Sequence, residues 1–338
     1  MRTKSYLIAL IVVAAWVLIL AGGVVPLGGA ATRSSAADAA SGLLAAVTTP
    51  DQNQPRTPIS SLPFTIAQPG SYYLTASLSL AAPDQNGIEV DANDVTIDLM
   101  GHSLTGAGGV NGISIAGRSN VEIRNGTLAY WEGDGIYEKG GTGHRILGIR
   151  ALRNSGSGIF LSGIAHVVRD CVALQNGEDG IAVPDGSTLD GNTAFGNYIG
   201  IYASSACTVI NNTSQGNWAA GMLVESGCTV SGNTLDNNQW PGFLPPPADI
   251  DSGTGLIVNG PGNAVRDNTL RGNSGANIRI KSTHNAIENN LVTGAPFGIY
   301  FEQTGNFYAN NRASQNTTNY MKAPSSTSPG NGGGNAAF

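Results

Sequence analysis

Aromatic side chains recur at matching positions along this chain of 338 residues. Tyr137, Phe160 and Tyr202 each stand two residues after a glycine, in the phrase Gly-Ile-aromatic. Flat rings that follow one another along a surface suit the faces of sugar rings, and a tyrosine hydroxyl can add a hydrogen bond. Aromatic residues are also favoured in β-strands wherever they point. The pattern therefore indicates either a sugar-binding surface or ordinary strand composition.

Charged residues and further rings extend this candidate surface toward the C-terminus. A hydrolase needs two carboxylates roughly 5 to 10 Å apart, and a lyase needs a base beside a cation or metal. Glu178 and Asp179 are direct neighbours in the sequence, and no complete catalytic set is evident. Catalytic residues are therefore left unassigned, and the predicted substrate-binding residues are Tyr137, Phe160, Tyr202, Glu225, Trp240, Arg279, Lys281 and Tyr300.

Histidines and cysteines share one column of the repeat. His144 and His166 occupy equivalent positions in adjacent repeats and are candidate metal ligands, although no third ligand is apparent. Cys207 and Cys228 continue the same column. In-register stacking would place their Cα atoms about 4.8 Å apart, which is within the range of a disulfide. The pair is therefore a disulfide candidate.

These residues are positioned by an internal repeat. A phrase that begins with Gly or Asn and an apolar residue recurs from Gly87 to Asn319 in steps of 20 to 25 residues, with one longer step between Gly221 and Gly255. Apolar residues alternate within each repeat, as in Ile299 and Phe301, which is the signal of a β-strand. A period of this length with strand patterning predicts a solenoid whose equivalent residues stack about 4.8 Å apart.

Two apolar columns and one asparagine column follow from this alignment. The first column runs from Ile88 to Ile299, and the second runs from Ile123 to Tyr308. Asparagine tolerates a left-handed corner, and stacked amides can hydrogen-bond from coil to coil. We therefore assign a structural role to the asparagine column, which consists of Asn192, Asn212, Asn233, Asn268, Asn290 and Asn311.

The longer step contains an insertion with Trp240, Phe243 and three consecutive prolines. Insertions in solenoids form loops on one face, often the binding face. Asp249 and Asp251 in this insertion are candidates for calcium binding, but two carboxylates do not define a site. No cofactor is assigned for this reason.

Composition and the termini define the remaining organisation. The net charge is -6, and the 17 basic residues form no stripe, which argues against a nucleic-acid partner. Residues 1–31 contain two basic residues and a long apolar run, which predicts a signal peptide or an N-terminal membrane anchor. Residues 32–58 are expected to be a disordered linker, 59–322 the repeat domain, and 323–338 a disordered tail.

The Gly-Ile-x-Val openings, the Asn-Asn-Thr corners and the coil length resemble the right-handed parallel β-helix superfamily. Pectate lyases, polygalacturonases and NosD-type accessory proteins belong to this superfamily. The resemblance covers about residues 60–322 and includes the segment from Pro63 to His102, which is similar to exported bacterial members. It implies an all-β, single-stranded, right-handed parallel β-helix, which we expect to have about ten coils.

Three functions remain open at this point. The first is an exported, non-catalytic protein of the cell surface or periplasm that binds glycans or serves as a scaffold. The second is a lyase, hydrolase or epimerase acting on an acidic polysaccharide. The third, which the NosD resemblance implies, is periplasmic metal handling through His144 and His166. The expected partner is a polysaccharide or cell-surface glycan, with the membrane as a second partner if residues 1–31 are retained.

Overall fold

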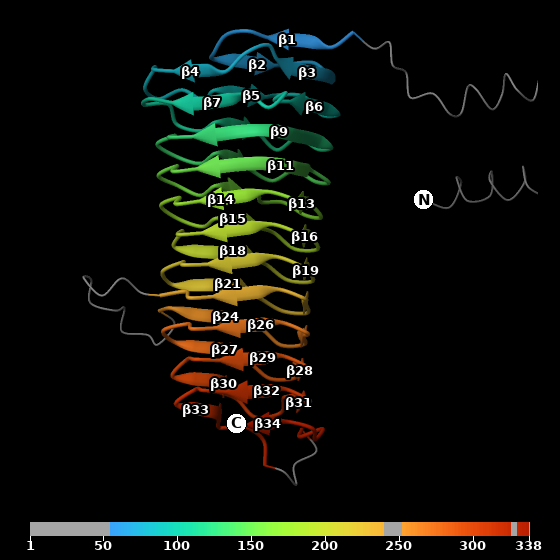
Figure 1. Cartoon of the computed structure of the whole chain (residues 1–338). Coiled ribbons are helices and arrows are strands. Elements are labelled where there is room, and N and C mark those ends of the chain that lie inside the picture. Colours follow the sequence, from blue (N-terminus) through green and yellow to red (C-terminus); the bar gives the residue numbers. More distant parts are fainter. Residues whose placement is uncertain (1–54, 240–251, 326–329, 338) are drawn as a thin grey trace, which may run out of the picture. The chain divides into compact units, whose positions relative to one another are not determined.

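The computed structural model describes residues 55–239, 252–325 and 330–337. The described residues from Pro55 onward belong to one compact unit, in which parallel strands stack coil upon coil (Figure 1). They contain no helix, and therefore no helix that is long and apolar enough to cross a membrane. The predicted signal or anchor and most of the predicted linker lie outside this range.

One face of the solenoid is a 12-stranded sheet that takes one strand from each turn. The solenoid thus has about twelve turns rather than the expected ten, because the predicted column from Ile88 to Ile299 includes neither the first nor the last turn. The strands are β2 (Phe64–Ile66), β5 (Ile88–Val90), β8 (Ile113–Ile115), β10 (Ile136–Glu138), β12 (Ile159–Phe160), β15 (Ile181–Val183), β18 (Ile199–Ala203), β21 (Ala220–Val224), β24 (Thr254–Val258), β27 (Ala276–Ile280), β30 (Phe297–Phe301) and β33 (Thr318–Met321).

The other strands of each turn belong to a 22-stranded sheet that forms two further faces. The second face contains β1 (Thr57–Ile59), β3 (Gly70–Leu74), β6 (Val95–Asp98), β9 (Val121–Ala129), β11 (Arg145–Leu152), β13 (Val167–Arg169), β16 (Thr188–Asp190), β19 (Thr208–Ile210), β22 (Thr229–Ser231), β25 (Ala264–Arg266), β28 (Ala286–Glu288) and β31 (Phe307–Ala309). The third face contains the ends of β9 and β11 with β4 (Leu78–Leu80), β7 (Ser103–Gly106), β14 (Val172–Leu174), β17 (Thr193–Phe195), β20 (Thr213–Gln215), β23 (Thr234–Asp236), β26 (Thr269–Arg271), β29 (Leu291–Thr293), β32 (Arg312–Ser314) and β34 (Ala336–Ala337).

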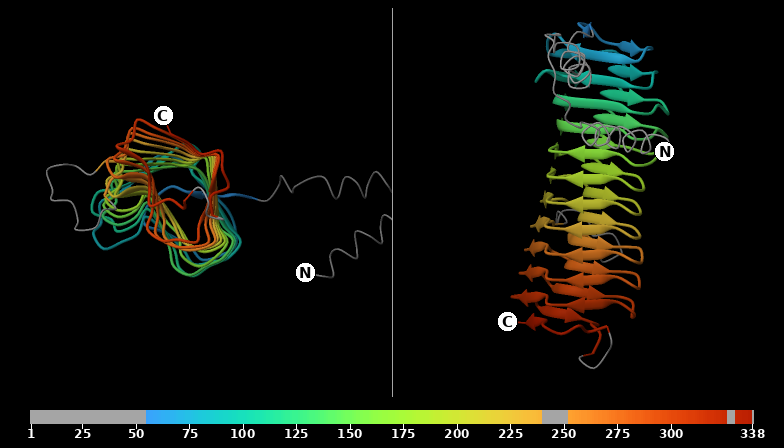
Figure 2. Two further views of the ribbon diagram at one scale, coloured as in Figure 1. Left: turned by 90° about the horizontal axis from the view of Figure 1, so that it is seen from below. Right: turned by 90° about the vertical axis from the view of Figure 1, so that its right-hand side faces the viewer.

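Seen along its axis, the stack encloses a narrow apolar core (Figure 2). Both predicted apolar columns are confirmed, since Ile136 pairs with Ile159 and Ile146 pairs with Val168 in register. A third inward column, which the sequence analysis did not identify, lines the third face. Many of its members are small: Ala151, Ala173, Ala194, Ser214 and Ala313.

Two boundaries differ from the sequence-based expectation. Strand β1 pairs with β3, so the solenoid begins within the segment predicted to be a linker. At the other end, β34 pairs with β32, and the Asn335 amide continues the asparagine column beyond Asn311. The described part of the predicted disordered tail is therefore ordered, because its asparagine and its small residues extend the same repeat.

Buried asparagines connect the coils at the corners. The Oδ1 atom of Asn212 accepts the main-chain N–H and the Nδ2–H of Asn192, both at 2.9 Å. Asn212 donates in the same way to Asn233, at 2.9 and 3.1 Å. This confirms the predicted structural role of the column. A second asparagine ladder, which the sequence analysis missed, occupies the corner before the 12-stranded sheet: Asn154, Asn176, Asn197, Asn217, Asn238 and Asn273.

We predict that Asn212→Ala lowers the free energy of unfolding by about 2–4 kcal/mol, measured by urea denaturation. The substitution leaves the buried N–H and Nδ2–H groups of Asn192 without an acceptor, and each unsatisfied buried group costs about 1–3 kcal/mol. The control is Gln215→Ala in the adjacent strand β20. Its side chain is exposed, so its effect should stay within about 0.5 kcal/mol. Equal destabilisation by both substitutions would contradict the ladder's role.

Candidate functional site

The outer face of the 12-stranded sheet carries the predicted aromatic row. Tyr137 and Phe160 pair in register on β10 and β12. Their rings are stacked, with centroids 5.8 Å apart and planes 12° from parallel. Both side chains are partly exposed, as is Tyr202, which follows two coils after Phe160. The coil between them has the buried residue Ala182, which is in register with both rings.

The carboxyl groups of Asp134, Glu178 and Asp179 lie at the corner where the chain enters this sheet. Main-chain hydrogen bonds place Asp134, Ser157 and Asp179 above one another in three consecutive coils. Burial raises the pKa of Asp134 to about 6; the hydrogen bond from Ser157 N, at 2.5 Å, opposes this rise and the charge of Glu178 adds to it. The pKa of Asp179 is also raised to about 6, mainly by burial and further by the negative charges of Glu178 and Asp134. At pH 7 the corner is therefore a crowded anionic site.

Tyr202 links this corner to the aromatic row. Burial raises the pKa of its hydroxyl, and the charges of Glu225 and Asp179 add to the increase. The predicted residue Glu225 is partly exposed, and it accepts two hydrogen bonds from Asn259 Nδ2, at 3.0 and 2.9 Å. The structure thus brings Tyr202 and Glu225 together with an acid that was not among the predicted site residues.

The remaining predicted binding residues lie elsewhere or have other roles. Arg279 was expected on the outer surface, but it is 7% exposed. Its guanidinium forms an ion pair with Glu302 and lies 5.7 Å from the centroid of the Tyr300 ring. Burial and ion pairing leave Arg279 little surface for a ligand, so its assignment as a binding residue is corrected. Lys281 is partly buried just after β27.

Tyr300 also contacts a residue beyond the predicted site. Lys322 Nζ lies 5.4 Å from the centroid of the Tyr300 ring and donates a 3.4 Å hydrogen bond to its hydroxyl. Tyr300 is therefore part of a small cluster with Arg279 and Lys322 at the C-terminal end of the sheet. Trp240, together with the calcium candidates Asp249 and Asp251, lies outside the described residues.

The two predicted metal ligands gain a third acidic neighbour in the structure. His144 and His166 are stacked, with ring centroids 4.7 Å apart. Glu138 points into the core column of β10, and its oxygens lie 3.7 Å from His144 Nε2 and 3.8 Å from His166 Nε2. This is the one group of three candidate ligands found among the described residues. In the sequence, Glu138 could have been noticed as the one carboxylate in a column that otherwise holds apolar residues such as Val90, Ile115 and Val183.

The hydrogen bonds of the rings do not fit metal binding. His144 Nδ1 accepts the main-chain N–H of Val121 at 3.1 Å, and His166 Nδ1 accepts that of His144 at 3.0 Å. An amide N–H can only donate, so each neutral ring must carry its proton on Nε2. With a proton on Nε2, this nitrogen has no lone pair available to coordinate a metal ion. Indeed, His166 Nε2 lies 2.7 Å from Ser162 O, which can only accept. Both histidines therefore accept main-chain hydrogen bonds through Nδ1, as the corner asparagines do through Oδ1, while Nε2 of His144 is buried without a hydrogen-bond partner.

Cys207 and Cys228 are buried free thiols, as is Cys171. The predicted disulfide between Cys207 and Cys228 is not formed in the structure. Each thiol contacts a carbonyl of the preceding coil, Cys207 at 3.2 Å from Pro184 O and Cys228 at 3.0 Å from Ser204 O.

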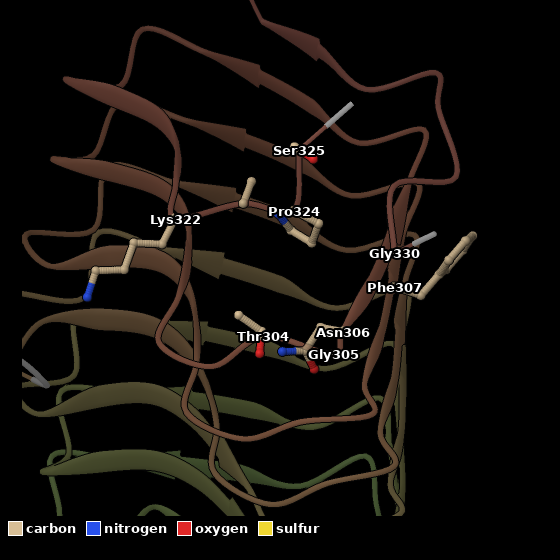
Figure 3. A pocket seen from close by; sticks show the side chains of 9 residues that line it. Thr304, Gly305, Asn306, Phe307, Lys322, Pro324, Ser325 and Gly330 are labelled. Atoms are coloured by element: carbon tan, nitrogen blue, oxygen red, sulfur yellow. The ribbon is translucent and has the colours of Figure 1, made fainter. Parts of the chain in front are cut away.

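A hollow of about 630 Å³ lies at the C-terminal end of the solenoid, between Thr304–Phe307 and Lys322–Ser325. Its two longest side chains, Lys322 and Phe307, point away from the other labelled side chains (Figure 3). The lining that remains is mostly main chain and short side chains. The described part of the lining therefore lacks the convergent polar groups of a ligand site.

We predict that Asp179→Asn stabilises the protein at pH 7–8 and has little effect at pH 4. The pKa of Asp179 is about 6 in the folded state and 3.8 ordinarily. At pH 7–8 the carboxyl group is ionised, which disfavours the folded state, whereas at pH 4 it is protonated in the folded protein. Thermal unfolding at the two pH values should show a gain of about 1–3 kcal/mol at the higher pH only.

Asp185→Asn is the matched control for this experiment. Hydrogen bonds from Ser204 and the Ser205 N–H lower the pKa of Asp185. Its stabilising contribution is present above the ordinary pKa and is lost as the pH falls. The control should therefore change stability in the opposite direction at pH 7–8. A gain of the same size at pH 4 for Asp179→Asn would contradict the burial of an ionised carboxylate.

Comparisons with known proteins place this fold. Residues 77–214 match a family model described as a right-handed β-helix region. The A-module of mannuronan C-5 epimerase AlgE6 from Azotobacter vinelandii is similar with a TM-score of 0.64 at 13% identity, covering 84% of this chain and 88% of that module. A double mutant of the periplasmic alginate epimerase AlgG gives 0.56 at 13% identity, with coverages of 81% and 76%.

The catalytic domain of an α-1,3-glucanase is also similar, with a TM-score of 0.50 at 13% identity and coverages of 83% and 63%. At this level of identity the structures share the fold alone. A search of curated proteins found no match. The family match and the stacked parallel coils together show that the fold is a right-handed parallel β-helix.

Proposed function

We propose that the protein binds a polysaccharide along the outer face of the 12-stranded sheet and does not cleave it. The observation that carries this proposal is the partly exposed, stacked ring pair of Tyr137 and Phe160, with Tyr202 further along the same row. Rings occupy two adjacent coils and, after the coil of Ala182, a third, so the row offers aromatic contacts at intervals along a sugar chain. Fold relatives named as a mannuronan epimerase and an α-1,3-glucanase support a polysaccharide as the ligand class.

We expect Tyr137→Ala and Phe160→Ala each to weaken polysaccharide binding about 3- to 10-fold, since an aromatic stacking contact contributes about 0.5–1.5 kcal/mol. Affinity electrophoresis through gels containing individual polysaccharides measures this effect. Phe195→Ala is the control, because Phe195 is 40% exposed but lies on β17 in the other sheet. Binding that depends on Phe195 and not on Tyr137 or Phe160 would exclude the proposed face.

A second candidate function, hydrolysis of the bound chain, rests on the carboxyl groups at the corner. Asp134 and Asp179 both have a pKa of about 6, which allows one to donate a proton while the other accepts one near that pH. They stand two coils apart, which corresponds to roughly 9.6 Å between Cα atoms. Inverting glycosidases hold their two carboxyl groups about 6.5–9.5 Å apart.

Release of reducing ends separates the two candidates. A hydrolase should lose at least about 100-fold in rate in Asp134→Asn and in Asp179→Asn, with binding retained. Its activity should be highest near pH 6, where one carboxyl group is protonated and the other ionised. A binding protein should release no reducing ends from any polysaccharide that it retards in the gel. Measurable turnover that survives both substitutions would rule out this acid pair.

A further inference from the structure

Two exposed aromatic side chains lie at the corner that leads into the 12-stranded sheet. Tyr198 is 40% exposed and Trp218 is 39% exposed. Each directly follows a buried asparagine of the ladder at this corner, and Asn197 N donates to Asn217 Oδ1 at 2.9 Å. The ladder therefore holds the main chain beside both rings in a defined position.

The corner rings continue the line of the carboxyl groups. Tyr198 N donates to Glu178 O at 2.9 Å, and Ala219 N donates to Tyr198 O at 2.8 Å. Glu178, Tyr198 and Trp218 therefore belong to three consecutive coils. Strand β18 begins immediately after Tyr198 and carries Tyr202 on its outer face. Rings are thus present both at the corner and on the sheet, next to the same carboxyl groups.

Acidic residues outnumber basic ones on this surface. The acids Glu132, Asp134, Glu178, Asp179 and Glu225 lie on its segments and are at least partly exposed, and the exposed cations Lys139 and Arg153 lie at its edges; the segments are 132–138, 155–161, 177–183, 198–204 and 218–226. Three other exposed arginines of the same coils lie on the other sheet: Arg145 and Arg150 on β11, and Arg169 on β13. A uronate or sulfate group on the aromatic surface would meet more like charges than opposite ones at short range.

We infer that the ligand of this surface is an uncharged polysaccharide and that Tyr198 and Trp218 extend its binding site around the corner. This inference rests on the proposed function and adds the substrate class and two binding residues to it. Rings supply stacking area for apolar sugar faces, and the carboxylates accept hydrogen bonds from sugar hydroxyls. The same carboxylates exclude anionic chains by repulsion. The surface therefore selects by charge as well as by shape.

The experiment compares polymers that share a backbone and differ in charge. The probes are hydroxyethylcellulose and carboxymethylcellulose, together with galactomannan and dextran as neutral chains and alginate and polygalacturonate as anionic chains. All measurements use affinity electrophoresis at pH 7.5 and low salt, with the full chain and with its Arg150→Gln variant. Arg150→Gln removes an exposed guanidinium of the other sheet, so binding of anionic chains there can be recognised.

We expect at least one neutral polymer to bind at least 10-fold more tightly than every anionic one. Tyr198→Ala and Trp218→Ala should each weaken that binding about 3- to 10-fold, while Phe195→Ala leaves it unchanged. The double substitution Glu178→Gln and Asp179→Asn should increase binding of anionic chains at the rings, because it removes two like charges.

Three outcomes would count against the inference. Anionic chains that bind as tightly as neutral ones, and lose binding in Tyr137→Ala or Phe160→Ala, would overturn the substrate class and leave the proposed function intact. Unchanged neutral binding in both Tyr198→Ala and Trp218→Ala would overturn the extension around the corner. If no polymer from either group is retarded, the proposed function itself fails.

Discussion

The structure depends on the need to satisfy buried main-chain groups at every corner of every coil. A narrow solenoid must bend three times per turn, and at each bend main-chain N–H groups leave the sheet ladders while remaining buried. Here, side chains that stack in register accept those hydrogen bonds. Asn212 accepts a hydrogen bond from Asn192 in one neighbouring coil and donates one to Asn233 in the other, so each asparagine satisfies buried polar groups of the next. The apolar columns bury hydrophobic side chains in the core, and the stacked polar side chains fix the register in which the coils pack.

This constraint also decides which residues remain for function. Inward and corner positions are committed to packing and hydrogen bonding, which leaves the outward positions and the residues that follow the corner asparagines. The rings of Tyr137 and Phe160 occupy the first kind of position, and Tyr198 and Trp218 occupy the second. His144 and His166 illustrate the opposite case. Their residue types suggested metal chemistry, yet their ring nitrogens serve as ladder acceptors.

The sequence allowed the fold to be predicted because its strongest signals are periodic. The columns beginning at Ile88 and Ile123 align by counting residues, and their registers are those of the structure. The third face was missed because its inward column contains Ala151, Ala173 and Ser214, which give little apolar alternation. The ladder from Asn154 to Asn273 was missed for a related reason: asparagine is abundant, and its role appears only when the corners are superposed.

The candidate site was less accessible to sequence reasoning. Which outward positions remain accessible depends on packing between coils, and this is why Arg279 was assigned to the surface although it is buried in an ion pair with Glu302. Glu138 was overlooked because its neighbours His144 and His166 follow only after a turn whose path the sequence does not specify. Likewise, the crowding of Asp134 with Glu178 requires that coils separated by more than 40 residues be stacked.

The imidazole pair has a further consequence for the behaviour of the solenoid in acid. Burial, with a further contribution from the neighbouring His144, lowers the pKa of His166, although contacts with Ser162 and Glu138 oppose this. A proton on Nδ1 would face an amide proton from the coil above, so protonation must break the ladder at that point. Coils that use asparagine at the equivalent position, such as that of Asn285, have no titrating group there. Below the ordinary histidine pKa of 6.5, a falling pH therefore removes stability through His166, whereas the asparagine ladder at Asn285 is unaffected.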